Sequence, residues 1–412
     1  MNIFESLFLI SVILIWFMVG YQFILTLFGY INFIGSIKEK RKLEGKDVVY
    51  PTCSILIPAH NEEKVIRKTI ESMLKLKYPD DKLKIIVIND GSTDSTREII
   101  EEFTKINKKV LLYDIPVNEG GKGKSRTLNL GIRQSDSEIV AIYDADNTPE
   151  ENALIYLVSQ LISDPALGAV IGKFKTRNKK QNLLTRFINI ETLSFQSILQ
   201  AGRWQLHNIA TLPGTNLVIR RSLITLLDGW DEEALTEDSE LSIRIFKSGY
   251  KIKYIPYAIT YEQEPQTWSA WSKQRIRWVR GNNYVLNKFI RHITDFKNRK
   301  LRIELFYTLS LYYIFFIAIL VSDLLFILSV VNLISIPLPG PYTLVWIIAF
   351  LVYVFEIMLA ISYDREDSVS NLGIIILMYF TYCQFWIYII LKAFYLENIR
   401  KAKHHWIKTE RF

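Results

Sequence analysis

The sequence predicts an α/β domain with a parallel sheet, flanked by helices that span a membrane. Half of the 412 residues are hydrophobic and the mean hydropathy is positive, which is too apolar for an ordinary cytosolic enzyme. Between about residues 50 and 300, short apolar runs alternate with helical patterns, as they do in βαβ units. Long apolar stretches lie on both sides of this region. Together these observations indicate one soluble domain joined to several membrane segments.

The first element is a membrane helix, assigned to residues 1–36. Residues 6–34 carry no charge and exceed the length that spans a bilayer. No Lys or Arg precedes them, whereas "KEKRKLEGK" follows at once. The positive-inside rule therefore predicts an external N-terminus and a cytoplasmic domain. A cleaved signal peptide is the alternative. It is not favoured, because the basic residues follow the apolar stretch instead of preceding it, and no small-residue cleavage site is present.

The soluble domain is assigned to residues 50–265. Its strand-like runs are "CSILIPA", "LKIIVIND", "KVLLYDI" and "EIVAIYDAD". Right-handed connections between such strands produce a parallel sheet, and ligands bind at the carboxyl ends of the strands. Three polar clusters fall at those ends: "HNEE", "NDGSTD" and "DADN". We therefore expect a ligand site there.

The C-terminal part is assigned to three segments: interfacial amphipathic helices over 266–300, membrane or interfacial helices over 301–397, and a cytosolic tail over 398–412. Apolar stretches occupy about 303–335, 342–362 and 371–395. Three complete crossings would place the basic tail outside, against the positive-inside rule. We therefore expect the last stretch, which polar residues interrupt at 381–384, to be re-entrant, interfacial or two short helices.

Composition excludes some classes of site. Cys53 and Cys383 lie far apart in apolar surroundings, so no disulfide framework or cysteine metal site is expected. The net charge of +8 is explained by cytoplasmic flanks of membrane helices, so no nucleic-acid partner is expected.

Two acidic clusters are candidates for binding a nucleotide and its metal. Asp144 and Asp146 of "YDADN" follow a strand and can share Mg²⁺ or Mn²⁺ that bridges phosphate oxygens. A solvated turn is the alternative. Asp90 of "VINDGSTD" can accept a hydrogen bond from a base, or the segment can simply cap a helix. The Gly- and Lys-rich "GGKGKSRTLN" suits a diphosphate, although it lacks the Walker A spacing.

Two further motifs could serve the acceptor. Glu237 and Asp238 of "LTEDSEL" can supply a general base or cap the next helix. In "QRIRW", residues Gln274, Arg277 and Trp278 share one helical face, an arrangement that can stack and hydrogen-bond a sugar. An interfacial belt helix is the alternative, and Arg275 and Arg280 are interpreted as plain interfacial charge.

In their order, "NDGSTD", "DAD", "TED" and "QRIRW" resemble the processive, membrane-embedded family-2 glycosyltransferases, which are the synthases of cellulose, chitin, hyaluronan and poly-N-acetylglucosamine. The resemblance covers nearly the whole chain. It implies a multi-pass protein of the plasma membrane whose nucleotide-sugar-binding GT-A (Rossmann-like) domain is cytosolic. It also implies a UDP-sugar donor, Mg²⁺ or Mn²⁺, a growing polysaccharide acceptor and contact with membrane lipids. Many bacterial cellulose synthases carry a C-terminal domain that binds cyclic-di-GMP. The resemblance does not extend to such a domain here, so regulation by cyclic-di-GMP would require a small accessory subunit.

The resemblance also implies roles for individual residues. The nucleotide-sugar contacts would be Glu62, Asp90, Lys124, Asp144 and Arg277, and the metal ligands Asp146 and Asp144. Asp238 would be the general base beside Glu237. The acceptor contacts would be Gln274, Arg277 and Trp278, with Gly214, Thr215 and Asn216 of "LPGTNLVIRR" lining the pocket. The tail "HWIKTERF" resembles a gating loop, in which Trp406, Lys408, Thr409 and Arg411 would close over the nucleotide.

The implied reaction is an inverting transfer that extends a β-glycan and passes it through the membrane. The "LPGTN" segment favours a β-glucan made from UDP-glucose, whereas the chain's size and membrane arrangement favour poly-β-1,6-N-acetylglucosamine. A non-processive glycolipid or polyprenyl-phosphate glycosyltransferase is a further alternative, but it should lack "QRIRW" and the gating-like tail. A catalytically inactive scaffold should have lost acidic positions, and none is missing.

Overall fold

The computed structural model describes residues 3–44, 48–291, 293–295, 299–334 and 342–401. Within them, eight strands form one sheet in the order β3-β2-β1-β4-β7-β6-β8-β5. The strands are β1 (Cys53–Ala59), β2 (Leu83–Asp90), β3 (Val110–Ile115), β4 (Ile139–Ile142), β5 (Thr148–Pro149), β6 (Leu167–Thr176), β7 (Leu217–Arg220) and β8 (Lys251–Glu262). Strands β1 to β4 pair in parallel, as predicted. β7 runs antiparallel to both β4 and β6, so the whole sheet is mixed.

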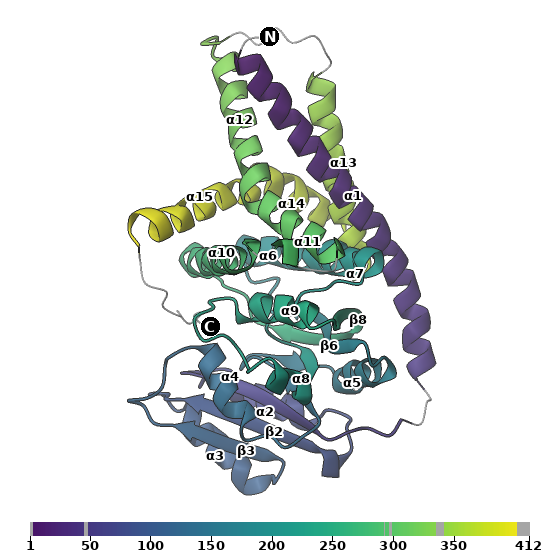
Figure 1. Cartoon of the computed structure of the whole chain (residues 1–412), viewed down its shortest axis with the longest axis vertical. Helices are drawn as coiled ribbons and strands as arrows, with labels where there is room; N and C mark the ends of the chain where they lie inside the picture. Colours follow the sequence, from purple (N-terminus) through teal and green to yellow (C-terminus); the bar gives the residue numbers. More distant parts are fainter. Residues whose placement is uncertain (1–2, 45–47, 292, 296–298, 335–341, 402–412) are drawn as a thin grey trace.

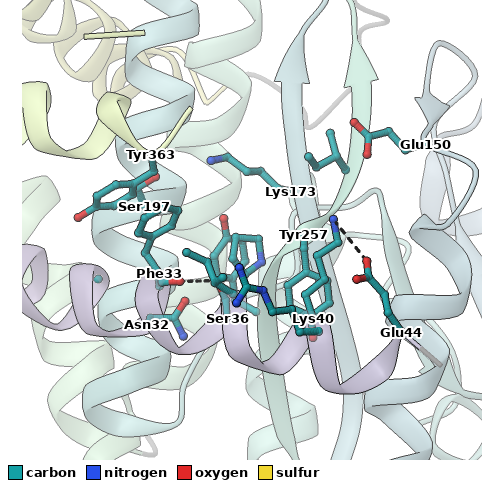
Figure 2. Close-up of a pocket in the computed structure, with 17 residues that line it drawn as sticks. Asn32, Phe33, Ser36, Lys40, Glu44, Glu150, Lys173, Ser197, Tyr257 and Tyr363 are labelled. Carbon is teal, nitrogen blue, oxygen red and sulfur yellow. Dashed lines mark hydrogen bonds and ion pairs between the residues drawn. The ribbon is translucent and has the colours of Figure 1, made fainter. Parts of the chain in front are cut away.

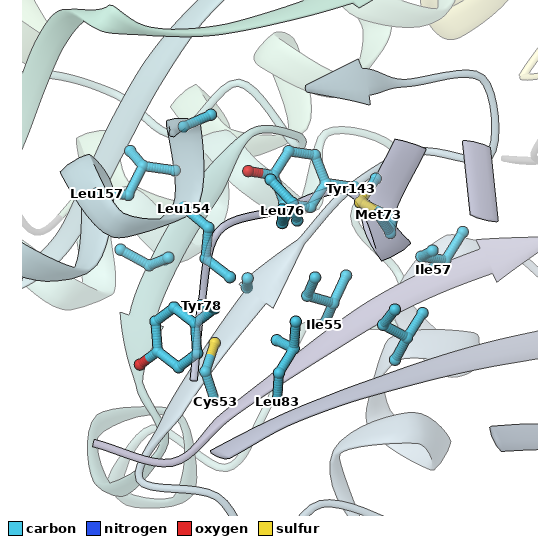
Figure 3. Packing of buried hydrophobic residues seen from close by; sticks show 14 of the residues in the cluster. Cys53, Ile55, Ile57, Met73, Leu76, Tyr78, Leu83, Tyr143, Leu154 and Leu157 are labelled. Atoms are coloured by element: carbon cyan, nitrogen blue, oxygen red, sulfur yellow. The ribbon is translucent and has the colours of Figure 1, made fainter. Parts of the chain in front are cut away.

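Helices cover both faces of the sheet (Figure 1). They are α2 (Ile66–Leu74), α3 (Thr96–Ile106), α4 (Lys124–Ile132), α5 (Ala153–Ser163), α8 (Arg221–Leu226) and α9 (Glu237–Lys247). Helices α6 (Leu183–Ser194), α7 (Ala201–His207) and α10 (Trp268–Ile290) lie between the sheet and the apolar helices. Because both faces are covered, β1 is apolar along its length. Ile55 and Ile57 pack with Met73 and Leu154 on one face (Figure 3), and Leu56 packs on the other.

The apolar helices extend from one end of this domain. They are α1 (Ile3–Leu43), α11 (Arg299–Leu309), α12 (Phe316–Val330), α13 (Tyr342–Ser362), α14 (Val369–Phe380) and α15 (Tyr382–Phe394). Among the described residues, three helical segments are long and apolar enough to cross a membrane: Ile3–Leu43, Leu344–Ser362 and Val369–Ile399. Helix α1 packs against α12 and α13, and the three extend together away from the sheet (Figure 1).

Two expectations about the C-terminal apolar stretches can be compared with the structure. The stretch predicted at 303–335 divides into α11, a π-helical segment and α12, and its apolar part, Tyr313–Ser329, is shorter than the three candidate spans. The stretch predicted at 371–395 is interrupted at Thr381, where φ is −125° and ψ is −76°. It therefore forms α14 and α15, the two-short-helix alternative, and α15 lies across the direction of α1 (Figure 1).

A cavity of about 410 Å³ lies between the C-terminal half of α1 and β8 (Figure 2). Its wall includes Phe33 and Lys40 of α1, Tyr257 of β8 and Tyr363 after α13. None of the predicted site residues that the structure describes lines it. The cavity is therefore separate from the candidate active site.

Candidate active site

The loops that follow β1 and β2 are joined by hydrogen bonds. The main-chain N–H of Asn61 donates to Ser92 Oγ at 2.9 Å, and the N–H of Thr93 donates to Asn61 Oδ1 at 2.7 Å. The N–H of Glu62 donates to Thr96 Oγ1 at 2.7 Å. Adjacent parallel strands end at the same edge of the sheet, so "HNEE" and "NDGSTD" lie together as predicted.

Asp90 ends β2 and is only 4% exposed. Burial raises the pKa of its carboxyl, although a hydrogen bond from Thr127 and the charge of His60 oppose the shift. Within the described residues, Asp90 Oδ1 has no hydrogen-bond partner. A buried acceptor without a partner is costly, so an N–H group of a ligand would be stabilised there.

Lys124 joins three of the sequence motifs. Its Nζ lies 2.5 Å from Asp144 Oδ1 and 3.6 Å from Glu237 Oε1, and it donates to the carbonyl of Gly214 at 2.8 Å. Burial lowers the pKa of Lys124, but Asp144 and Glu237 outweigh it and hold the pKa above its ordinary value. Residues from "GKSRTLN", "DAD", "TED" and "LPGTN" thus form one polar cluster.

The "DAD" loop is held by hydrogen bonds from several directions. The N–H of Asp144 donates to Thr215 Oγ1 at 3.0 Å and to Asn147 Oδ1 at 3.2 Å. Asp146 is 2% exposed, and its Oδ2 accepts from the N–H of Gln263 at 2.9 Å. Nowhere in the described ranges do three His, Cys, Asp or Glu side chains form a set that could hold a metal. Two carboxylates are nevertheless a suitable donor set for Mg²⁺ or Mn²⁺, because such ions take their other ligands from diphosphate and water.

Asp238 lies in the first turn of α9, beside Lys124 and Gly214. Gly214 has a φ of +80°, and a Cβ there would be 3.1 Å from Asp238 Oδ2. Burial raises the pKa of Asp238 to about 7; Glu237 adds to the shift, and Lys124 and Arg277 oppose it. A carboxyl with a pKa near the working pH is suited to accept a proton.

The "QRIRW" motif lies on α10, which packs directly on the "TED" segment. A Cβ at Gly281 would be 2.7 Å from Thr236 Oγ1 and 2.9 Å from its main-chain nitrogen. Arg277 is near enough for its charge to lower the pKa of Asp238. The predicted acceptor motif and the predicted base therefore lie close together.

We expect Gly281→Ala to push α10 away from α9. Because the new methyl group would clash with both the side chain and the main-chain nitrogen of Thr236, the variant should lose about 1–3 kcal/mol of stability and most of its transferase activity. Thermal unfolding and a transfer assay would measure both effects. Gly20→Ala is the control, since a Cβ at Gly20 meets nothing within 4 Å. Equal behaviour of the two variants would show that the contact with Thr236 is unimportant.

The comparison with protein families agrees with this site. The model described as "Glycosyltransferase like family 2" matches residues 51–281, more than half of the chain. The chain belongs to glycosyltransferase family 2. The matched segment contains every motif of the cluster, from "HNEE" to "QRIRW".

Two relatives are also named as sugar-transferring enzymes, and one solved structure shares the fold. A probable glycosyltransferase of Bacillus subtilis, YdaM, is 42% identical over 99% of this chain and 98% of its own length. The poly-β-1,6-N-acetyl-D-glucosamine synthase of Staphylococcus epidermidis is 35% identical over 57% of this chain and 55% of its own length. A Pyrobaculum calidifontis mannosyltransferase, solved with GDP-Man and Mn²⁺, superposes with a TM-score of 0.59 and 21% identity, covering 87% of this chain and 98% of its own. The predicted GT-A-like fold with apolar helices is confirmed.

In this family-2 glycosyltransferase, the interpretation of Arg275 and Arg280 as interfacial charge was wrong. Arg275 is 1% exposed and Arg280 is 8% exposed. Arg275 forms an ion pair with Glu191 of α6, and its guanidinium lies 4.0 Å from the centre of the Trp278 ring. The charge is therefore buried behind the motif.

The remaining predicted residues are placed as follows. Asn216 is fully buried, and its Nδ2 donates to the carbonyls of Lys173 and Ala258, so its side chain joins β6 and β8 rather than facing the site. Thr215 supports the "DAD" loop through Asp144. The tail residues Trp406, Lys408, Thr409 and Arg411 lie outside the described residues.

Sequence reasoning missed Glu191. Its Oε2 accepts from Arg275 and from the Tyr382 hydroxyl, and its Oε1 accepts from Trp386 Nε1 at 3.1 Å. The available signal was a carboxylate within the apolar run "FINIETLSF". Such a residue is almost never buried without a partner.

Proposed function

We propose that this glycosyltransferase is a processive, inverting enzyme that polymerises a UDP-hexose into an extracellular β-glycan and moves the polymer through the plasma membrane. The catalytic domain would be cytoplasmic. The single observation that carries the proposal is the cluster around Lys124, which joins the predicted nucleotide, metal and base motifs. Helix α10 brings the predicted acceptor motif against the same cluster.

A divalent cation fits the "DAD" loop. Asp146 and Asp144 would hold Mg²⁺ or Mn²⁺ together with the donor's diphosphate. When bound, the cation would offset negative charge on the UDP leaving group. Asp90 Oδ1 would accept from the base, with Glu62 beside it, which is consistent with the unpartnered buried oxygen of Asp90.

The protein's own residues would perform the transfer in one displacement. Asp238 would take the proton of the acceptor hydroxyl. At the same time the oxygen of that hydroxyl would attack the anomeric carbon from the face opposite UDP, which would leave with the electrons of the broken bond. Lys124 and Arg277 would place positive charge where the leaving group becomes negative. Trp278 would stack the acceptor ring, and Gln274 would hydrogen-bond it. The α-linked donor thus becomes a β-linked product.

Two donors are supported about equally. The "LPGTN" segment favours UDP-glucose and a β-glucan. The similarity to poly-β-1,6-N-acetyl-D-glucosamine synthases favours UDP-N-acetylglucosamine. The proposal therefore covers both donors, and the product identifies the enzyme's substrate.

The deciding experiment uses membranes that contain the full chain. Labelled UDP-glucose, UDP-N-acetylglucosamine and GDP-mannose are each supplied with Mg²⁺ or Mn²⁺, and insoluble product is digested with linkage-specific glycanases. We expect polymer from one UDP-sugar, and none from membranes that carry Asp238→Asn. A labelled lipid without polymer would establish the non-processive alternative, and transfer from GDP-mannose alone would overturn the proposed donor class.

A further inference from the structure

We propose that Arg275 and Glu191 are positioning residues that fix the acceptor-binding face of α10 and tie it to α15. This inference deepens the proposed function and rests on it. Neither residue is expected to touch the sugar. They act on Gln274 and Trp278, to which the proposed function gives the acceptor contact.

Arg275 contacts both of these residues. Its guanidinium lies over the Trp278 ring, 4.0 Å from the ring centre, and its Nη1 donates to Gln274 Oε1 at 2.7 Å. A planar guanidinium stacks on an aromatic face and donates in its own plane at the same time, which Lys cannot do. Arg275 thus covers one face of the indole, so a sugar ring would have to stack on the opposite face.

The arginine is itself held by a largely buried network, in which the side chain of Arg275 is 1% exposed and that of Glu191 is 22% exposed. Glu191 Oε2 accepts from Arg275 Nη2 and, at 2.7 Å, from the hydroxyl of Tyr382, which begins α15. Trp386 of α15 donates to Glu191 Oε1 at 3.1 Å. Trp271 of α10 donates to the Tyr382 hydroxyl at 2.8 Å. One carboxylate therefore connects α6, α10 and an apolar helix.

Simple stability does not account for a charge pair at this position. Replacing a buried ion pair with apolar side chains of similar volume is often neutral or stabilising, whereas removing one partner is strongly destabilising. The charges instead specify orientation, because a guanidinium with a stacked ring and two directed hydrogen bonds has one rotamer that satisfies all of them. We infer that the network fixes the indole plane relative to α15, beside which the acceptor would pass.

The test compares single and double variants in membranes that carry the full chain. Arg275→Met leaves the partly buried Glu191 carboxylate without its cation, so this variant should unfold more readily. Arg275→Met with Glu191→Leu removes both charges and should regain thermal stability. If the pair positions the acceptor residues, the double variant should still bind the acceptor poorly. Its KM for an added product oligosaccharide should be about tenfold higher than that of the wild type, which is about the value of one lost cation–π contact, and it should make shorter polymer. Its KM for the UDP-sugar and its rate of donor hydrolysis stay within twofold of the wild type.

Two further variants sharpen the test. Arg275→Lys keeps the ion pair but not the planar stack, so it should fold normally and show the same rise in acceptor KM. Lys273→Met, which removes an exposed cation from the same helix, should change neither KM. A double variant that is stable and has wild-type acceptor KM and product length would overturn the positioning role. If the wild type transfers no sugar from either UDP donor, the proposed function fails instead, and the two failures are thereby distinguished.

Discussion

Asp238→Asn is expected to reduce glycosyl transfer by at least about 100-fold, the typical contribution of a general base. The amide is nearly isosteric but cannot take a proton from the acceptor hydroxyl. Nucleotide binding should be unchanged within a few fold, because the predicted UDP contacts come from other loops. Transfer to an oligosaccharide and binding of UDP by calorimetry would measure the two effects on the same preparation.

The matched control is Glu233→Gln, which changes an exposed carboxylate a few residues before Asp238. It should transfer sugar at the wild-type rate. Substantial transfer by Asp238→Asn would remove Asp238 as the base. Loss of UDP binding together with transfer would show that the substitution disturbs the Lys124 cluster as a whole.

The pH dependence of the wild type follows from the same carboxyl. Burial raises the pKa of Asp238 to about 7, from an ordinary value of 3.8. The base is active when deprotonated, so kcat/KM should rise with pH and level off above about 7. Since the folded carboxyl holds its proton to higher pH than the unfolded one, this group lowers stability as pH rises from 3.8 to about 7. A kcat/KM profile flat between pH 5 and 8 would contradict this assignment.

The sequence predicted those parts of the site that depend on chain direction. Parallel strands end at one edge, so "HNEE", "NDGSTD" and "DADN" could be placed together before their contacts were known. The role of Lys124 as a connector could not be predicted, because it requires α4 and α9 to approach one another across the sheet edge. Helical spacing found the face of Gln274 and Trp278, but not the carboxylate 84 residues away that holds Arg275.

The positions of the apolar helices could also be predicted in part. Hydropathy located the stretches, and the polar residues near Thr381 indicated where the last one breaks. How the apolar helices attach to the catalytic domain was not predicted, because the contacts join segments that are distant in sequence. One part of the attachment is an apolar cluster that joins α1, α13, α14 and α15 to α6 and α10. Another part consists of carboxylates in the loop between α13 and α14 that pair with lysines of β6 and the following turn.

Removal of the Asp364 carboxylate should cause a large loss of stability. Asp364 forms ion pairs with Lys173 and Lys175, and the side chains of Asp364 and Lys173 are 6% and 4% exposed. Asp364→Leu leaves the Lys173 ammonium buried without a carboxylate partner, whereas Lys175 can turn to water. We therefore expect Asp364→Leu to lose about 3–5 kcal/mol of stability. A fall in the midpoint of thermal unfolding in detergent, with faster amide exchange in β6, would measure the loss.

Two companion variants separate the charge effect from simple loss of packing. Asp364→Leu with Lys173→Met buries no unpaired charge, so it should recover most of the midpoint. Lys179→Met breaks the pair with Glu366 at a lysine side chain that is 38% exposed, and it should cost less than about 1 kcal/mol. If the double variant were as unstable as Asp364→Leu, the loss would come from packing around the loop rather than from a buried charge. Packing of the loop would then hold the apolar helices to β6, and the ion pair would contribute little to the stability.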